Sequence, residues 1–218
     1  MRDQRAVIQL LFQVLKICFI ESLFHQFTTY SHPFAYVFRI KLAKGGIRCL
    51  EITMNTPGAL NMIEQASKNP ELLVGAGTVL DVASARESIR RGARFVLSPS
   101  LDVKVITYCL DHGVLPVPGV FTPTEMFTAH KAGAPLIKIF PAGSVGPQYI
   151  KDLLGPFKGM RLLPVGGVSV ENTAAFMQAG AFAVGVGSYL ANPDLAKKKA
   201  WESITSRAKL FLEQAVLR

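Results

Sequence analysis

Lys138 lies in an apolar run whose surroundings could make a lysine a nucleophile. The segment from Leu136 to Phe140 reads Leu-Ile-Lys-Ile-Phe and is followed by Pro141, which predicts a short buried strand. Burial disfavours the charged ammonium, and the amine form of a lysine can attack a carbonyl carbon to give a Schiff base. A lysine near a strand end can instead extend its stem to water, and this structural role is the commoner one. The surrounding sequence has to decide between these two roles.

Glu51 is a carboxylate in a second apolar run, between Leu50 and Ile52. The segment 48–53 is predicted to be a strand. A buried carboxylate and a buried lysine can form a structural ion pair. They can also be a proton-transfer group and a nucleophile, each tuned by the other. The sequence gives no separation between the two groups, so both possibilities stay open.

Several further candidates stand where predicted strands end. Thr78 could cap a helix or hydrogen-bond a substrate carboxylate. Gly166-Gly167 and Gly187-Ser188 end the last two predicted strands, where glycine lets backbone N–H groups approach an anion. A glycine pair alone is a weak signal, but two at consecutive strand ends favour a phosphate site. Pro99 follows another strand end in the same way.

Seven strand–helix units are predicted from residue 45 onward. Such an alternation gives a parallel sheet, and the right-handed crossover rule leaves a barrel or a doubly wound sheet. An eighth unit, with a strand at 23–29 and a helix at 33–44, would complete a (β/α)8 barrel whose first unit is divergent. We therefore expect an α/β fold with an atypical segment at 1–22 and a single barrel domain at 23–218. The predicted strands are 48–53, 72–78, 94–98, 114–117, 136–140, 161–164 and 182–187, and the predicted helices are 56–67, 82–91, 102–112, 123–132, 147–154, 169–178 and 195–216.

The net charge of +9 on 218 residues favours anionic partners such as phosphorylated metabolites. No basic stripe with interleaved aromatic residues occurs, so a nucleic-acid partner is not expected. The cysteines and histidines lack the spacing of metal ligands, so no metal is expected, and the unpaired cysteine count suits a reducing compartment. Part of the charge is predicted to lie on the outer face and end of one helix, at Arg86, Arg90, Arg91 and Arg94.

The apolar stretch 6–24 is interrupted by Gln9, Gln13, Lys16 and Glu21. These residues make it too polar for a membrane span, and an amphipathic helix is the favoured prediction. We expect a cytoplasmic protein with no stable membrane association. A leader for an organelle such as the chloroplast is the alternative.

Seven motifs together resemble the KDPG/KHG aldolase family, which comprises class I aldolases that cleave 2-keto-3-deoxy-6-phospho sugar acids. They occur in the family's order and spacing over about residues 45–190, and jointly they are very specific. The motifs are LEITMNTP (50–57), VGAGTVL (74–80), LSPS (97–100), PGVFTPTE (118–125), IKIFP (137–141), PVGGV (164–168) and VGS (186–188).

The resemblance implies a Schiff base on Lys138, with Glu51 as the general acid and base. It also implies that the products are pyruvate and glyceraldehyde 3-phosphate, that the protein is a homotrimer, and that no metal or cofactor is needed. The remaining implied roles are a carboxylate ligand at Thr78, a pocket wall at Phe140, further substrate contacts at Asn55, Pro99 and Val165, and a phosphate site at Gly166, Gly167, Gly187 and Ser188.

Three departures from the family pattern bear on the substrate. Phosphogluconate-type members generally carry Arg at the position of Asn55 and Thr at that of Val165, whereas phosphogalactonate aldolases look more like this chain there and over 140–151. Without the Thr hydroxyl, discrimination at the C4 hydroxyl should be weaker, so the C4 epimer stays open, with a lean towards the galactonate side or a relaxed enzyme. The first strand also lacks the family's substrate-binding arginine. Two alternatives are therefore a phosphate-binding barrel isomerase and a non-catalytic relative.

Overall fold

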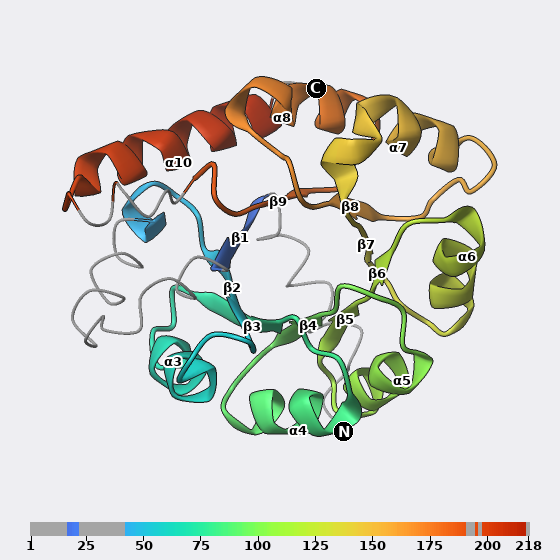
Figure 1. Ribbon diagram of the computed structural model, residues 1–218, viewed down its shortest axis with the longest axis horizontal. Helices are drawn as coiled ribbons and strands as arrows, with labels where there is room; N and C mark the ends of the chain where they lie inside the picture. Colours follow the sequence, from blue (N-terminus) through green and yellow to red (C-terminus); the bar gives the residue numbers. More distant parts are fainter. Residues whose placement is uncertain (1–16, 22–41, 191–194, 196–197, 217–218) are drawn as a thin grey trace.

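Parallel strands alternate with helices through the residues that the computed structural model describes, namely 17–21, 42–190, 195 and 198–216 (Figure 1). Apart from the first strand and the two-residue strand at 119–120, the strands lie where short apolar runs predict them. The strands are β1 (Ile17–Glu21), β2 (Cys49–Thr53), β3 (Leu73–Gly77), β4 (Phe95–Leu97), β5 (Leu115–Val117), β6 (Gly119–Val120), β7 (Ile137–Ile139), β8 (Leu162–Pro164) and β9 (Val184–Val186).

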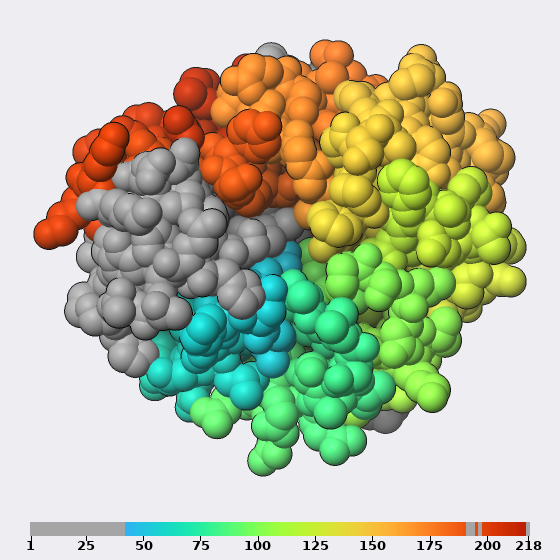
Figure 2. All heavy atoms as spheres, in the orientation of Figure 1, coloured from blue at the N-terminus to red at the C-terminus, as the bar shows by residue number. Residues whose placement is uncertain are grey.

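The helices lie on the outside of the strands, as Figure 1 shows. A short 3-10 helix, η2 (Ala142–Ser144), follows β7. The α-helices with defined bounds are α3 (Ala59–Ser67), α4 (Val82–Arg90), α5 (Val103–Asp111), α6 (Pro123–Lys131), α7 (Gly146–Leu154), α8 (Val170–Gln178) and α10 (Trp201–Val216). In the space-filling view the side chains of α4 to α7 form a continuous layer around one side of the molecule (Figure 2).

The strands form two parallel sheets, ordered β5-β4-β3-β2-β1-β9 and β6-β7-β8. The sheets meet at both edges. Only Pro118 separates β5 from β6, and the chain passes there from pairing with β4 to pairing with β7. At the other edge, Val165 forms a parallel bridge with Gly185. If β5 and β6 are taken as one interrupted strand, the ring seen in Figure 1 is an eight-stranded barrel, as predicted.

The first strand lies earlier in the chain than predicted. β1 pairs with β2 through Cys18 and Cys49 and with β9 through Cys18 and Gly185, so it fills the gap that the sequence analysis assigned to residues 23–29. It lies within the stretch 6–24 that was predicted as an amphipathic helix, and at 17–21 that prediction is wrong. The segments 23–29 and 33–41 lie outside the described residues. Residues 17–20 are a short apolar run followed by Glu21, and periodicity alone does not distinguish such a run from helix.

Residues on each strand alternate between the barrel interior and the helices. Cys49, Phe95, Leu136 and Leu163 belong to the cluster that fills the interior, whereas residues one position along each strand pack against the helices. Because side chains alternate along a strand, Glu51 shares the inward side with Cys49, and Lys138 shares it with Leu136. The two candidate catalytic groups therefore point into the same barrel.

The ends of the helices follow from local sequence. Thr122 and Glu125 form a reciprocal capping box at the start of α6, with Pro123 at the first helical position. The helix predicted over 195–216 instead begins at Trp201. Lys199, with a φ of 52°, lies in the left-handed region, which a continuous right-handed helix cannot contain.

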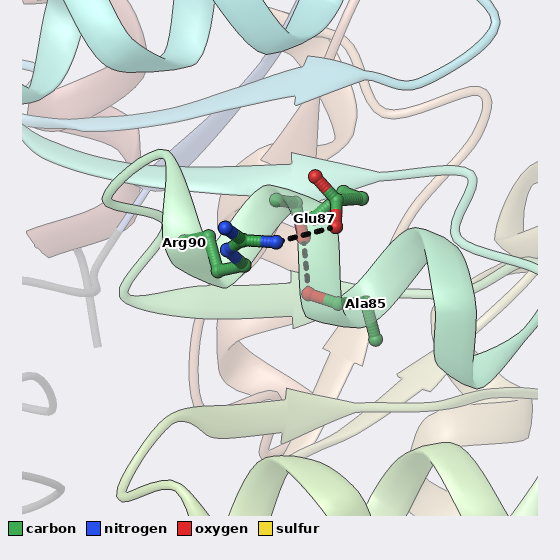
Figure 3. A network of polar contacts seen from close by, with 4 residues as sticks. Ala85, Glu87 and Arg90 are labelled. Carbon is green, nitrogen blue, oxygen red and sulfur yellow. Dashed lines mark hydrogen bonds and ion pairs between the residues drawn. The ribbon is translucent and has the colours of Figure 1, made fainter.

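The arginines predicted on the outer face of one helix lie on and beside α4, as expected. Figure 3 shows the ion pair between Arg90 and Glu87, with an N–O distance of 3.3 Å, and the nearby Ala85, whose carbonyl accepts a hydrogen bond from the Ser88 hydroxyl. Arg91 forms an ion pair with Glu64 of α3. Exposed pairs of this kind contribute little to stability, and they give two of these arginines a carboxylate partner within the protein.

Candidate functional site

Glu51 is a buried carboxyl in the middle of β2, and its side chain is 1% exposed. Burial raises its pKa from 4.5 to about 7, and the positive charge of Lys138 opposes this rise. Among the residues that the structure describes, none forms a hydrogen bond with its Oε2 atom. A buried oxygen without a partner is costly, which points to a site that a ligand or water completes. A carboxyl of this pKa can release and accept protons near neutral pH.

Lys138 is the second buried ionisable group, in the middle of β7 and 5% exposed. Its backbone N–H donates to the Pro118 carbonyl, which ties β7 to the chain between β5 and β6. Its Nζ atom lies 4.7 Å from the ring centroid of Phe140. A cation over an aromatic face is stabilised there, so the ring holds the lysine head in place. The lysine stem therefore does not lead the amine out to bulk water, as the structural role would have required.

Gly77, at the end of β3, lies directly against the Glu51 carboxyl. An ideal Cβ atom on Gly77 would lie 1.6 Å from Oε1 of Glu51. Gly77 belongs to the motif VGAGTVL (74–80), from which no role was predicted for it. Its signal was a glycine inside an apolar strand, which often marks the close approach of another group.

The polar residues predicted at the strand ends do lie at one edge of the barrel, because every strand pair is parallel. Thr78, directly after β3, is half-buried and has a φ of 54°, an uncommon conformation for a β-branched residue. Such strain is found where the surroundings over-determine the backbone, often at ligand sites. Pro99 is half-buried after β4, and Asn55 is exposed in the turn after β2.

Gly166 and Gly167 follow β8 with φ values of 85° and 77°, which glycine adopts without strain. The Gly143 N–H donates to the Gly166 carbonyl at 2.7 Å, and Asn172 Nδ2 donates to the Gly167 carbonyl at 2.9 Å. Their own N–H groups have no acceptor within the described part of the chain. With carbonyls engaged and N–H groups available just before α8, this turn can bind an anion. Gly143, which the sequence analysis also missed, allows this packing because its Cα lies against Gly167.

The remaining candidates lie close to that turn. Val165 is 3% exposed, and its bridge to Gly185 brings the ends of β8 and β9 together. Gly187 is half-buried and Ser188 is exposed in the turn after β9. The structure thus places two glycine turns, one apolar side chain and the Phe140 ring at the same edge of the barrel as Thr78.

Among the described residues, no group of three His, Cys, Asp or Glu side chains could hold a metal ion. No helix in the described ranges is long and apolar enough to cross a bilayer.

Comparison with known sequences gives a consistent result. A relative from Treponema pallidum (strain Nichols), named 2-dehydro-3-deoxy-phosphogluconate aldolase, is 37% identical over 138 residues, which is 62% of this chain and 66% of the relative. A relative from Rhizobium meliloti (strain 1021), named as a probable 2-dehydro-3-deoxy-6-phosphogalactonate aldolase, is 37% identical over 157 residues, or 71% of this chain and 74% of the relative. The match to the first relative thus spans just under two thirds of its length.

Solved structures agree in fold. A native KDPGal structure superposes with a TM-score of 0.81 at 30% identity, covering 92% of this chain and 94% of the other. A KDPG aldolase from Legionella pneumophila, with pyruvate captured as a covalent carbinolamine intermediate, gives 0.79 at 25% identity, covering 95% and 97%. A cube-shaped cage designed by fusing symmetric oligomeric domains gives 0.80 at 30% identity, covering 92% and 72%.

The family model for KDPG and KHG aldolase matches residues 35–207. That range contains Glu51, Thr78, Lys138 and both glycine turns. This chain therefore belongs to the KDPG and KHG aldolase family.

Proposed function

We propose that this protein is a class I aldolase that cleaves a 2-keto-3-deoxy-6-phospho sugar acid to pyruvate and glyceraldehyde 3-phosphate. One observation carries the proposal: a lysine and a carboxyl are both buried in one barrel, where burial raises the carboxyl pKa to about 7 against the opposing effect of the lysine charge. A structural ion pair would hold its carboxylate with hydrogen bonds, whereas Oε2 of Glu51 has no partner among the described residues.

The chemistry starts at the Lys138 amine. Its Nζ adds to the C2 carbonyl carbon of the keto acid, and water leaves to give a protonated imine. The Glu51 carboxylate then accepts the proton of the C4 hydroxyl, C4 becomes the aldehyde carbon, and the C3–C4 electron pair moves into the imine to form an enamine. The Glu51 carboxyl returns a proton to C3, and water hydrolyses the imine to release pyruvate. One group with a pKa of about 7 can serve in both directions near neutral pH.

The two ends of the substrate are assigned to opposite parts of the barrel edge. Thr78 would hold the carboxylate next to the imine, beside Glu51 and β3. The N–H groups of Gly166 and Gly167, with Gly187 and Ser188, would hold the phosphate. Binding energy at both ends would fix the C3–C4 bond relative to Glu51 and Lys138. The Phe140 ring, 37% exposed and over the Lys138 head, would wall the pocket between them.

The protein should discriminate only weakly between the two epimers of the substrate at C4. Val165 presents a buried apolar side chain where a hydroxyl would distinguish the two epimers. We expect the ratio of kcat/KM for the phosphogalactonate and phosphogluconate epimers to lie within about tenfold of unity, since without a hydrogen bond discrimination is small. Val165→Thr should widen the preference for the gluconate epimer. A wild-type preference of several orders of magnitude would show that another residue reads C4.

Borohydride trapping with pyruvate tests the proposed reaction. Wild-type protein incubated with pyruvate and reduced should carry the adduct on the peptide that contains Lys138. Lys138→Met should abolish the adduct, and Lys104→Met, at an exposed lysine of α5, should not. If folded wild-type protein gives no adduct, the Schiff-base reaction is refuted. If Lys138→Arg retains full turnover, the site belongs to a different phosphate-binding enzyme such as an isomerase.

We also propose that the protein assembles as a homotrimer. The described surface carries exposed aromatic side chains on and near α6, with Phe121 39% and Phe127 43% exposed, and the Phe127 ring packs against Phe157 at 5.8 Å. Exposed apolar patches of this kind are typical of interaction sites. Sedimentation velocity should give three times the chain mass, and a monomer at micromolar concentration would contradict the proposal.

A further inference from the structure

Gly77 is the residue against which the Glu51 carboxyl rests. A Cβ built on Gly77 would lie 1.6 Å from Oε1, 2.3 Å from Cδ and 2.6 Å from Cγ of Glu51. These are the three nearest heavy atoms, and all of them belong to one side chain. Gly77 itself lies in β3, where it pairs with Thr53, and its carbonyl accepts a hydrogen bond from the Met54 N–H. Its extended backbone suits any residue, so conformation does not require a glycine there.

The register of β2 against β3 shows in which direction the Glu51 side chain extends. Glu51 pairs with Gly75, two residues before Gly77 on the same face of β3. The Glu51 side chain therefore leans along β3 towards the carboxyl end of the barrel, where Thr78 and the glycine turns lie. With any larger side chain at position 77, the carboxyl could not take this course.

We propose that Gly77 is a positioning residue of the aldolase site, whose missing side chain sets where the Glu51 carboxyl sits. This inference rests on the proposed aldolase function for its catalytic consequence, but not for its steric part. In Gly77→Ala, Oε1 must move from 1.6 Å to at least 3.0 Å from the new Cβ, a displacement of about 1.4 Å. A misplacement of about 1 Å can cost roughly 10²-fold in rate, because proton transfer requires hydrogen-bond contact.

A double-mutant cycle on thermal stability tests the steric part without substrate. The four proteins are wild type, Gly77→Ala, Glu51→Ala and the double variant. Gly77→Ala should lower the midpoint of thermal unfolding by several degrees when Glu51 is present. It should change the midpoint by about a degree or less in the Glu51→Ala background, since contacting residues are not additive. An equal loss in both backgrounds would overturn the proposal.

Gly45→Ala is a control at a tightly packed glycine away from Glu51. Its Cβ would lie 2.4 Å from the Cβ of Ala208 and 3.0 Å from the Thr205 carbonyl oxygen, so it should lower the midpoint equally with or without the Glu51 side chain. The folded Gly45→Ala protein should retain the pH dependence of the wild type, because its strain falls between the start of β2 and α10.

The catalytic part is read from the pH profile of kcat. A displaced carboxyl should be less buried, which lowers its pKa, so the acidic limb of the Gly77→Ala profile should shift to lower pH as kcat falls about 10²-fold. Unchanged kcat and an unchanged limb in folded Gly77→Ala would refute the positioning role.

Two outcomes separate this inference from the proposed function. If wild-type protein fails to trap pyruvate on Lys138, the aldolase proposal falls, while the stability cycle still decides the steric claim. If Gly77→Ala does not fold, folding of the double variant supports the steric claim, and failure of both variants to fold overturns it.

Discussion

Replacing Glu51 by Gln should make the stability of this protein less dependent on pH, with a magnitude that follows from one pKa. In the folded protein burial raises the pKa of Glu51 to about 7, whereas in the unfolded chain it takes its ordinary value of 4.5. Between these values the folded state keeps a proton that the unfolded chain has lost. The contribution of Glu51 to folding is therefore most favourable below pH 4.5 and declines as the pH rises through 7.

The expected size is about 2.5 kcal/mol between pH 5 and pH 8, obtained by integrating the linkage relation at about 1.4 kcal/mol for each pH unit of the pKa difference. The Glu51→Gln variant has no such titration. As the pH rises from 5 to 8, wild type should therefore lose this amount of stability and the variant should not. The difference in free energy of unfolding, variant minus wild type, should rise by the same amount. Using the change with pH, rather than the absolute difference, cancels the constant effect of exchanging a hydroxyl for an amide.

Urea denaturation at pH 5, 6, 7 and 8 for both proteins measures the difference directly. Glu125→Gln is the control, at a carboxyl whose pKa in the folded protein is lowered and not raised. Hydrogen bonds from the Phe121 N–H and from Thr122 lower the pKa of Glu125, so its loss should cost nearly the same at pH 5 and pH 8. If the difference in free energy of unfolding between Glu51→Gln and wild type stays constant within about 0.5 kcal/mol across this range, burial does not raise the pKa of Glu51.

Three further predictions concern other parts of the barrel. Thr122→Ala removes the cap of α6 and should lower the free energy of unfolding by about 1 kcal/mol, with Thr122→Ser retaining most of it in the same denaturation assay. Gly166→Ala places a side chain at a φ of 85° and 3.1 Å from the Phe140 ring, so KM for the phosphorylated substrate should rise while pyruvate trapping on Lys138 persists; equal losses in both assays would contradict a phosphate role. Burial raises the pKa of the Cys109 thiol to about 12, so peptide mapping should find it alkylated at pH 8 only after unfolding, and rapid labelling of native protein would contradict this.

The position of β1 shows where sequence patterns reach their limit. Predicted strands such as 136–140 and 182–187 contain β7 and β9, because each is a short apolar run between turn residues. The N-terminal stretch is apolar over many residues and carries no turn signals that delimit a strand. Only pairing with Cys49 on β2 and Gly185 on β9 selects residues 17–21.

Lys138 and Glu51 were identifiable from sequence alone, because a charged residue inside an apolar strand is a local pattern that burial makes costly. The strand ends that supply Thr78, Gly166 and Gly187 were identifiable for a different reason, since parallel strands bring their carboxyl ends to one edge. The alternation of strands and helices likewise predicted the barrel.

Tertiary structure decided what lies within a few ångströms of each group. The pKa of Glu51 depends on how completely the barrel excludes water and on the charge of Lys138, 87 positions along the chain. The clearance at Gly77 depends on the register of β2 against β3, and the Phe140 ring over Lys138 on the turn after β7. Sequence determined which groups face the interior, because alternation along a strand is local. Their distances and proton affinities arise from contacts between segments that only the closed barrel brings together.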